Sequence, residues 1–359
     1  MVTGATMGLV SLSTHPLPVV AYFDMNVWVE MARGQRMQDV EWNRAITALH
    51  VAVTEARLAV ALSAAHYLEL WHRRDMTSRE AVGAVMRDVT GYAALSPIQR
   101  VRRLEIEALV DRHMGGSRRV STQDLLGQGV VHAFDSPDGR FRFVASIETS
   151  ERREGEPAAA PDVMTDLRAR PALWEWVNLV GTQDFIDGDW VDRTPEHRLG
   201  DRYAQQQLRL RQRVRDEPLV RARLRDHILV EEVVDVTDEI NRVCVERDVD
   251  PHGLFFKAHA DSSPEAVRRF VEELPSVDAS VSLRWWKHKD LGMNWEQHDK
   301  VDLMSLAVAA PYADVVVTER RWEHLLRASG LAKRHKTIVG RGVDGVWAAL
   351  ELAGTARSE

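Results

Sequence analysis

Short apolar runs alternate with longer segments of helical periodicity in the first and last parts of the chain. The runs lie at positions 19–23, 58–62, 92–96, 314–318 and 336–340. Strands of a parallel sheet are covered on both faces, so they read as continuous apolar stretches rather than as alternating ones. The pattern therefore predicts an α/β fold in which a parallel sheet carries helices on both faces.

The segments between and after these runs have helical spacing, and several have recognisable ends. Ser63 is a suitable N-cap for a helix over 64–74, and Pro97 suits the first turn of a helix that runs to about position 114. Gly34 predicts the end of a short helical turn that begins after Asp24. Further helices are predicted from about Thr77 and over 39–57, 298–310, 320–332 and 343–354.

The middle of the chain has a different texture. Positions 149–162 are polar and rich in proline and alanine, which predicts a loop. Positions 140–148 alternate and predict a pair of strands, while 196–247 form a long helical tract that is broken or bent at Pro218. We therefore expect a mostly helical insertion between two parts of one α/β core.

This contrast defines the predicted domains. Residues 18–116 form the first part of the core, 117–277 the insertion and 278–359 the second part of the core. Many arginines lie between 198 and 225, but they wrap around the predicted helix and acids lie nearby. A solvated helix with internal ion pairs is the simpler interpretation of that tract.

Composition and charge restrict the partners. The chain has 359 residues, of which 45% are hydrophobic and 28% charged, and its net charge is −7. Nucleic-acid binding would therefore need a local basic surface. The one cysteine, Cys244, excludes an internal disulfide. The single cysteine also fits a reducing cytoplasm, so we expect a cytoplasmic protein. No uncharged apolar window reaches the roughly 18 residues of a membrane span, so we expect no membrane partner.

Several acids follow or flank the predicted strands. Asp24 directly follows the first run, Glu69 lies on the helix after the second, and Glu319 follows the run at 314–318. Asp299 and Asp302 are three positions apart, which places both on one face of a helix. Ligands of open parallel sheets bind at the carboxyl ends of strands. We therefore expect these carboxylates to converge in one cleft.

Such a group of carboxylates points to hard cations. Like charges held close together repel one another, and Mg²⁺ or Mn²⁺ resolves the conflict because both ions prefer oxygen ligands. Two such ions can activate a water and stabilise the leaving oxygen of a phosphodiester. Taken singly, each acid has a simpler explanation: an Asp after a strand is often a helix cap, and Glu69 has Arg73 as a helical neighbour.

At these residues the sequence resembles the PIN-domain family of metal-dependent nucleases. The family's first motif is an apolar strand that ends in Asp, followed one residue later by Asn or Ser, and "VVAYFDMNVW" supplies Asp24 and Asn26. The second is a Glu on the helix after the second strand, often preceded by a Ser. Here "AVALSAAHYLEL" supplies Ser63 and Glu69.

Two further motifs follow in the same order as in the family. An Asp that opens a helix of small and apolar residues is matched by Asp302 in "DLMSLAVAA", and "VVVTERRW" supplies Thr318 and Glu319. The last motif usually ends in Asp, so Asp314 in "PYADVVVTE" is a second candidate for the fourth acid, and Asp299 resembles an accessory acid of the same subgroup. The resemblance covers about 18–114 and 277–353.

The resemblance implies Mg²⁺- or Mn²⁺-dependent RNA cleavage in which water is the nucleophile. Asp24, Glu69 and Asp302 would hold the metals, and Glu319 or Asp314, with Asp299 nearby, would complete the site. Three polar residues would support the ligands by hydrogen bonds, namely Asn26, Ser63 and Thr318. A role in bacterial toxicity or defence, a homo-oligomer and an antitoxin or other protein regulator are expectations of the same kind.

One segment interleaves aromatic and basic residues directly before the acidic helix. It could stack on bases and hold phosphates through Arg284, Trp285, Trp286, Lys287 and Lys289, joined by Arg320. The alternative is that both tryptophans seal the insertion against the core. Two other functions stay open: a catalytically weakened nucleic-acid-binding or scaffold protein of the same fold, and a phosphatase or nucleotide hydrolase with the same metal chemistry.

Overall fold

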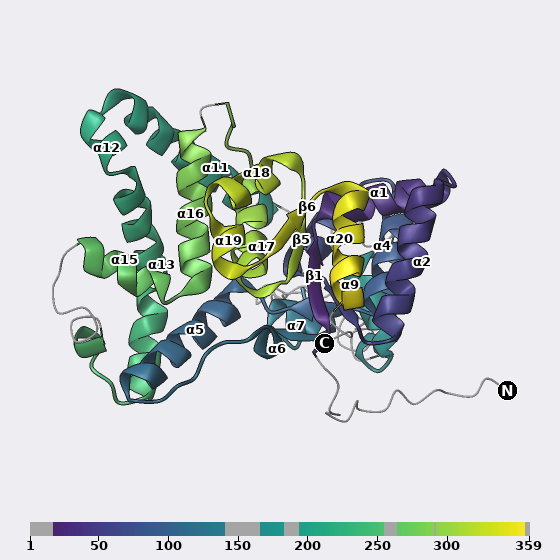
Figure 1. Ribbon diagram of the computed structural model, residues 1–359, viewed down its shortest axis with the longest axis horizontal. Coiled ribbons are helices and arrows are strands. Elements are labelled where there is room, and N and C mark those ends of the chain that lie inside the picture. The colour runs from purple at the N-terminus through teal and green to yellow at the C-terminus, as the bar shows by residue number, and fades with distance from the viewer. Residues whose placement is uncertain (1–16, 141–165, 183–193, 255–263, 291, 356–359) are drawn as a thin grey trace, which may run out of the picture.

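Four parallel strands form the main sheet, in the order β2-β1-β5-β6. The computed structural model describes residues 17–140, 166–182, 194–254, 264–290 and 292–355 (Figure 1). The strands are β1 (Val19–Phe23), β2 (Leu58–Ala61), β5 (Val315–Val317) and β6 (Ile338–Gly340). Each lies within an apolar run of the sequence, which confirms the prediction of an α/β fold with a parallel sheet.

A second, antiparallel strand pair extends this sheet. It consists of β3 (Ala93–Leu95) and β4 (Leu126–Gln128), and a bridge between Leu62 and Ala94 joins it to the edge of β2. The strand β3 was predicted from its apolar run. The strand β4 was not predicted, because three residues containing a glycine give no period to detect.

Helices cover both faces of the sheet, and the strands alternate between the two cores. Val19, Ala21 and Phe23 face one core, while Val20 and Tyr22 face the other. The first core is closed by α1 (Met25–Arg36), α2 (Val40–Thr54), α4 (Met76–Thr90) and α20 (Gly342–Thr355). The second is closed by α5 (Ile98–His113), α16 (Pro275–Lys289), α17 (Asp299–Tyr312), α18 (Arg320–Ala328) and α19 (Leu331–His335).

A third core lies in the helical part of the molecule, on the left in Figure 1. It is formed by α11 (Thr194–Asp216), α13 (Leu224–Glu246) and α15 (Pro264–Glu272), which pack against α5 and α16. The short helix α12 (Pro218–Ala222) joins α11 to α13. The break at Pro218 is therefore confirmed, as expected for a residue that cannot donate a helical hydrogen bond.

Two helices from the early part of the predicted insertion pack against the sheet. The helices α7 (Gly129–Phe134) and α9 (Pro171–Leu179) pack against the first core of the sheet, and α6 (Thr122–Leu125) precedes β4. The early part of the predicted insertion 117–277 thus packs with the sheet, whereas the separate helical lobe starts at α11. The predicted strand pair at 140–148 lies outside the described residues except for Arg140.

The predicted end of the first helix at Gly34 is wrong. The helix α1 continues to Arg36, and a Cβ atom at Gly34 would lie 2.6 Å from the Trp42 side chain of α2. The glycine therefore permits two helices to approach closely rather than ending one of them. Among the described helices, none is both long and apolar enough to cross a membrane.

Candidate active site

The site lies between β1 and β5, where the strand order of the sheet reverses. From β1 the chain moves outward to β2 on one side, and it later returns to place β5 on the other side of β1. The carboxyl ends of two such strands leave a crevice between the loops that follow them. Asp24 follows β1 and Thr318 follows β5, so both line this crevice.

Asp24 is held rigidly at the start of α1. The Thr318 hydroxyl donates to Asp24 Oδ2 at 2.7 Å, and the Met25 backbone N–H donates to Oδ1, also at 2.7 Å. Burial raises the pKa of Asp24 and nearby Glu319 raises it further, although the two hydrogen bonds oppose the shift. Thr318 thus orients an acid, as predicted.

The end of β1 is tied to the helix that carries Glu69. The Phe23 carbonyl accepts hydrogen bonds from Trp28 Nε1 at 3.0 Å and from His66 Nε2 at 2.7 Å. The other ring nitrogen of His66 accepts from the Ser63 backbone N–H at 2.8 Å, so the imidazole is neutral. Burial lowers the pKa of His66 to about 4. The helix α3 (Ala64–Trp71) is therefore fixed against the strand that ends in Asp24.

Ser63 has a different role from the one predicted. Its hydroxyl lies 3.2 Å from His66 Nδ1 and 3.4 Å from the Ser305 hydroxyl, and within the described residues it makes no hydrogen bond to an acid. It belongs to the N-terminal cap of α3. Sequence reasoning missed Tyr22, whose buried side chain lies beside both serines and close to Asp24, and whose pKa is raised chiefly by burial.

Glu69 projects from α3 toward the other acids. Burial raises its pKa well above the usual value, and Asp302, Asp24 and Glu319 raise it further. Within the described part of the chain, no hydrogen bond or ion pair reaches its carboxylate. The simpler explanation based on Arg73 fails, because that guanidinium donates to the Ser78 hydroxyl at 3.0 Å.

Asp302 enters the same crevice from α17. Its Oδ2 accepts from Trp322 Nε1 at 3.0 Å and from Arg321 Nη2 at 3.2 Å. Burial, with repulsion from Asp24, raises the pKa of Asp302 to about 8 despite these two donors. Trp322 was not predicted as a site residue, and it holds this carboxylate at the crevice.

Glu319 completes the group from the start of α18. Its Oε2 accepts a hydrogen bond from Asn26 Nδ2 at 3.2 Å, so Asn26 does support a carboxylate, as predicted. Residues from β1, α3, α17 and the end of β5 therefore meet in one crevice, which we call the acid cluster: Asp24, Glu69, Asp302 and Glu319.

Arg321 lies among these acids and was missed by sequence reasoning. It pairs with Glu319, with Asp302 at 3.2 Å, with Glu296 at 3.1 Å and with Asp299 at 3.5 Å. Helical spacing could have found it. Trp322, Leu325 and Leu326 form the buried face of α18. At about 100° per residue, Arg321 flanks that face whereas Arg320 points away from it.

Asp314 is not the fourth acid. It precedes β5 and therefore lies at the amino end of that strand, on the opposite edge of the sheet from Thr318 and Glu319. Its Oδ2 accepts from the Val20 backbone N–H at 2.8 Å, and its own N–H donates to the Val20 carbonyl. The prediction of Asp314 as a metal ligand is wrong, because the strand separates it from the acid cluster.

Asp299 lies behind the acid cluster in a buried ion pair. Its Oδ1 is 2.8 Å from Lys287 Nζ, and both side chains are 0% exposed. Lys287 therefore cannot contact a nucleic acid, and Asp299 already has a cation as its partner. Arg284 is also buried, where it pairs with Glu231 and with Glu232 at 2.9 Å. The nucleic-acid prediction is wrong for Lys287 and Arg284, because helix packing turns both inward.

The remaining predicted contacts are accessible at least in part. Trp285 packs against the third core and Trp286 against the second, so both help to join the helical lobe to the sheet, as the alternative reading proposed. Lys289 is exposed, and its Nζ lies 4.7 Å from the Trp285 ring and 4.4 Å from the Trp286 ring. Arg320 is exposed as well.

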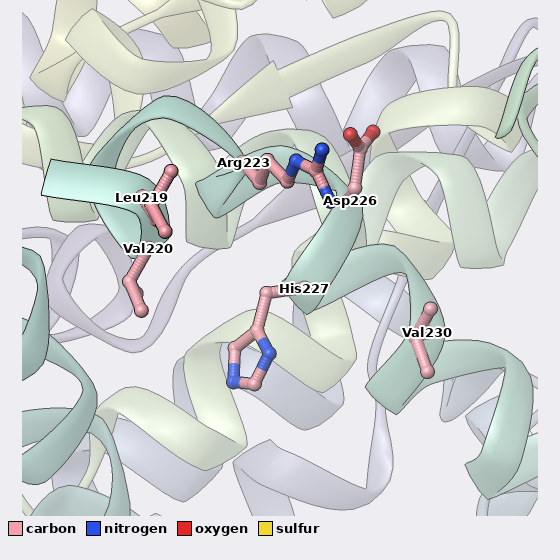
Figure 2. Close-up of a pocket in the computed structure, with 6 residues that line it drawn as sticks. All are labelled: Leu219, Val220, Arg223, Asp226, His227 and Val230. Carbon is pink, nitrogen blue, oxygen red and sulfur yellow. The ribbon is translucent and has the colours of Figure 1, made fainter. Parts of the chain in front are cut away.

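A separate groove lies away from the acids, at the elbow between α12 and α13 (Figure 2). Its volume is about 360 Å³ and its lining is mainly apolar, with Leu219, Val220, Arg223, Asp226, His227 and Val230. None of the predicted site residues lines it. The groove is thus unrelated to the chemistry that the sequence suggests.

The acid cluster suits a hard divalent cation by the chemistry of its donors. All four side chains offer carboxylate oxygens, and the pKa values of Asp24, Glu69 and Asp302 are raised first by burial and then by repulsion from the neighbouring acids. Within the described residues, however, no three His, Cys, Asp or Glu side chains are arranged as a ready metal cage. The Arg321 guanidinium lies between Glu319 and Asp302, where such an ion would bind.

Comparisons with known proteins add no family to this picture: no family model, curated protein or solved structure matches the chain. Its function is therefore inferred from its own residues and their arrangement.

Proposed function

We propose that the protein is a divalent-metal-dependent endoribonuclease similar to the PIN-domain nucleases. The single observation that carries this proposal is the acid cluster, in which carboxylates from four separate segments share one crevice. Its position at the carboxyl ends of β1 and β5 is the position at which open parallel sheets bind ligands.

Mg²⁺ or Mn²⁺ would be held by Asp24, Glu69, Asp302 and Glu319, and when bound it would supply an activated water and stabilise the leaving oxygen of a phosphodiester. The chain's other residues position these ligands. Thr318 orients Asp24, Trp322 orients Asp302 and Asn26 orients Glu319. Such hydrogen bonds to metal ligands typically change metal affinity or activity about 10–100-fold when removed.

The proposed substrate is single-stranded RNA. With a net charge of −7, the chain needs local positive charge to hold a polyanion. Lys289 and Arg320 are exposed cations, and the partly buried rings of Trp285 and Trp286 lie beside Lys289. Aromatic rings next to cations are typical of sites that bind unpaired bases. A protein regulator and a homo-oligomer follow from the family resemblance alone.

The test compares cleavage of single-stranded RNA by the wild-type protein and by variants, with Mn²⁺, Mg²⁺ or EDTA. Asp24→Asn and Asp302→Asn should each lower kcat/KM by at least about 100-fold, which corresponds to about 2.7 kcal/mol of transition-state stabilisation. Their circular dichroism spectra should stay unchanged. The matched control is Asp314→Asn, which alters an acid at the opposite edge of the sheet and should keep full activity.

Equal activity in EDTA, or full activity of Asp24→Asn, would rule out the proposal. Single-stranded DNA and free nucleotides belong in the same assay. Hydrolysis of nucleotides without cleavage of RNA would identify a phosphatase or nucleotide hydrolase instead.

A second candidate is a catalytically weakened protein that binds nucleic acid or serves as a scaffold. The observation in its favour is Arg321, whose ion pairs with Glu319 and Asp302 place a side-chain cation where a nuclease would hold its metal. In that case RNA would bind without cleavage, and Mn²⁺ would not change the melting temperature.

A further inference from the structure

Arg321 differs from an ordinary surface arginine in the number and placement of its partners. Its guanidinium pairs with Glu319 and Asp302 of the acid cluster and also with Glu296 and Asp299. These partners belong to α17, the preceding loop and the N-cap of α18. Arg321 thus forms ion pairs with acids from three separate segments of the chain.

The local charges do not balance even with this arginine. Six carboxylates face the region: the acid cluster, Glu296 and Asp299. The cations that pair with them are Arg321, Lys287 and, only if protonated, His298 beside Glu296. Neither Asp24 nor Glu69 has an ion-pair partner among the described residues. A further cation is therefore electrostatically favoured in the crevice, and Arg321 supplies only part of the compensation.

We infer that Arg321 is an exchangeable counter-cation: its guanidinium neutralises Glu319 and Asp302 in the metal-free protein and gives them up when a divalent cation binds. This inference rests on the proposed function, because it assumes that the acid cluster holds a metal. It goes beyond that function by assigning a role to a residue outside the predicted site.

The geometry allows Arg321 to leave without unfolding its surroundings. Its side chain is 25% exposed and extends from the first turn of α18, so rotation of the side chain alone reaches solvent. Lys287 cannot do the same, because it is fully buried against Asp299. When Arg321 moves away, Lys287 still neutralises Asp299, and Glu296 is exposed enough to be solvated.

The released guanidinium has an evident new partner. A planar guanidinium binds phosphate oxygens in a bidentate manner, and a phosphodiester bound at the acid cluster would bring such oxygens to the crevice. Arg321 would then contact carboxylates in the metal-free state and substrate phosphate in the loaded state. Metal binding would release Arg321 from the carboxylates and so make it available to the phosphate. Phosphate binding would in turn hold Arg321 away from the metal ligands, so metal and RNA would each increase the affinity for the other.

The first experiment measures Mn²⁺ affinity by titration calorimetry at pH 7. Arg321→Met should bind Mn²⁺ at least about 10-fold more tightly than the wild type, because the competing cation is gone. Arg321→Lys keeps a charge at this position and should stay within about 3-fold of the wild type. The matched control is Arg320→Met, which removes the neighbouring arginine on the exposed face of α18 and should leave the affinity unchanged.

The outcomes separate this inference from the proposed function. If the wild type binds Mn²⁺ and Arg321→Met binds it equally or more weakly, the exchange is wrong while a metal site remains. If neither the wild type nor any variant binds Mn²⁺, the proposed function fails as well. Circular dichroism of each variant verifies that the titrated protein is folded.

The second experiment tests the coupling between metal and phosphate. Fluorescence anisotropy measures the affinity for a phosphorothioate RNA, which resists cleavage, with and without Mn²⁺. Mn²⁺ should raise the affinity of the wild type, whereas Arg321→Met should lose most of that increase. Equal coupling in Arg321→Met would overturn the phosphate role of Arg321.

Discussion

At the residue scale, Glu69 differs from the other members of the acid cluster in having no compensating group. Asp24 accepts two hydrogen bonds, while Asp302 and Glu319 each contact Arg321 and one further donor. Within the described residues nothing equivalent reaches Glu69, and burial with repulsion raises its pKa. Without a bound cation, ionisation of Glu69 therefore destabilises the fold.

This predicts opposite effects of Glu69→Gln on stability and on activity. Removing the charge should stabilise the metal-free protein by about 1 kcal/mol, which raises the melting temperature by about 2 °C. The same change should abolish Mn²⁺-dependent RNA cleavage. Differential scanning fluorimetry in EDTA and the cleavage assay measure the two effects. A lower melting temperature would mean that the Glu69 carboxylate stabilises the fold.

The sequence was informative about which acids meet but not about the cation between them. Asp24, Glu69 and Glu319 follow strands or lie on a following helix, so strand order alone predicted their convergence. Arg320 and Arg321 are adjacent and identical, and their angles to the buried face of α18 show that Arg321 flanks that face, but only the folded structure shows that the acids lie on its side. Strand order also does not decide whether Asp314 or Glu319 is the fourth acid. The hydrogen bond from the Val20 backbone N–H places Asp314 at the opposite edge of the sheet from the acid cluster.

At the element scale, α16 and α17 are joined by the buried pair of Lys287 and Asp299. Asp299 also accepts from the Glu296 backbone N–H at 2.6 Å and so fixes the loop that leads into α17. On the other side, Arg211 of α11 donates to the Lys287 carbonyl at 2.8 Å, near the end of α16. The helical lobe thereby supports the helix that delivers Asp302.

Removing one member of this pair should cost far more than replacing both. Lys287→Met leaves the buried Asp299 with the Arg321 guanidinium, 3.5 Å away, as its remaining cation, and should lower the free energy of unfolding by at most about 3–5 kcal/mol. Adding Asp299→Asn removes the stranded charge but keeps an acceptor for Glu296, so the double variant should recover at least half of the loss. Urea denaturation of both single variants and the double variant measures this coupling. Additive losses would show that the two side chains do not interact.

Amphipathic periodicity predicted the existence of most helices but not how they approach one another. Gly34 predicts a helix end because glycine commonly follows the last turn. In the structure it lies inside α1, where Trp42 of α2 packs against it. A close contact between two helices depends on the tertiary structure, so the local sequence pattern does not predict it.

At the scale of the whole molecule, buried carboxyl groups make stability depend on pH. The pKa of Asp302 is raised from 3.8 to about 8, and burial raises that of Glu105 to about 7. A raised folded-state pKa contributes stability that is fully present below the unfolded-state pKa and is lost as pH rises through the folded-state value. Both groups therefore destabilise the fold progressively between about pH 4 and 8.

Two buried histidines act in the opposite direction at lower pH. Burial lowers the pKa of His66 to about 4 and that of His288 to about 3. Their contribution to the free energy of unfolding is therefore lost as the pH falls below their unfolded-state pKa of 6.5. Above pH 6.5 these histidines stay largely neutral whether the chain is folded or unfolded. The carboxyl groups then determine the trend.

The melting temperature in EDTA should accordingly fall between pH 6.5 and 8.5, and Asp302→Asn should reduce that fall. Saturating Mn²⁺ should also reduce it, because a bound cation replaces the protons on the acid cluster. Scanning fluorimetry across this range, with and without Mn²⁺, measures both effects. A melting temperature that rises with pH in EDTA would contradict the prediction.

The predicted insertion shows the limit of sequence reasoning at this scale. Its helices were evident from their spacing, but α7 and α9 pack with the sheet while α11 begins the separate lobe. The amphipathic faces look alike, and only three-dimensional packing assigns each to a core.

The hydrogen bond between Thr318 and Asp24 joins residues 294 positions apart. Ribosomes deliver a chain from its amino terminus, so Asp24 emerges early and waits for β5 while the entire helical lobe is made. A nascent chain that ends before Val315–Val317 lacks β5, so it cannot bring Asp24 close to Glu319. In the proposed nuclease, an incomplete chain would therefore lack its assembled acid cluster and would not cleave the messenger RNA from which it is still being translated.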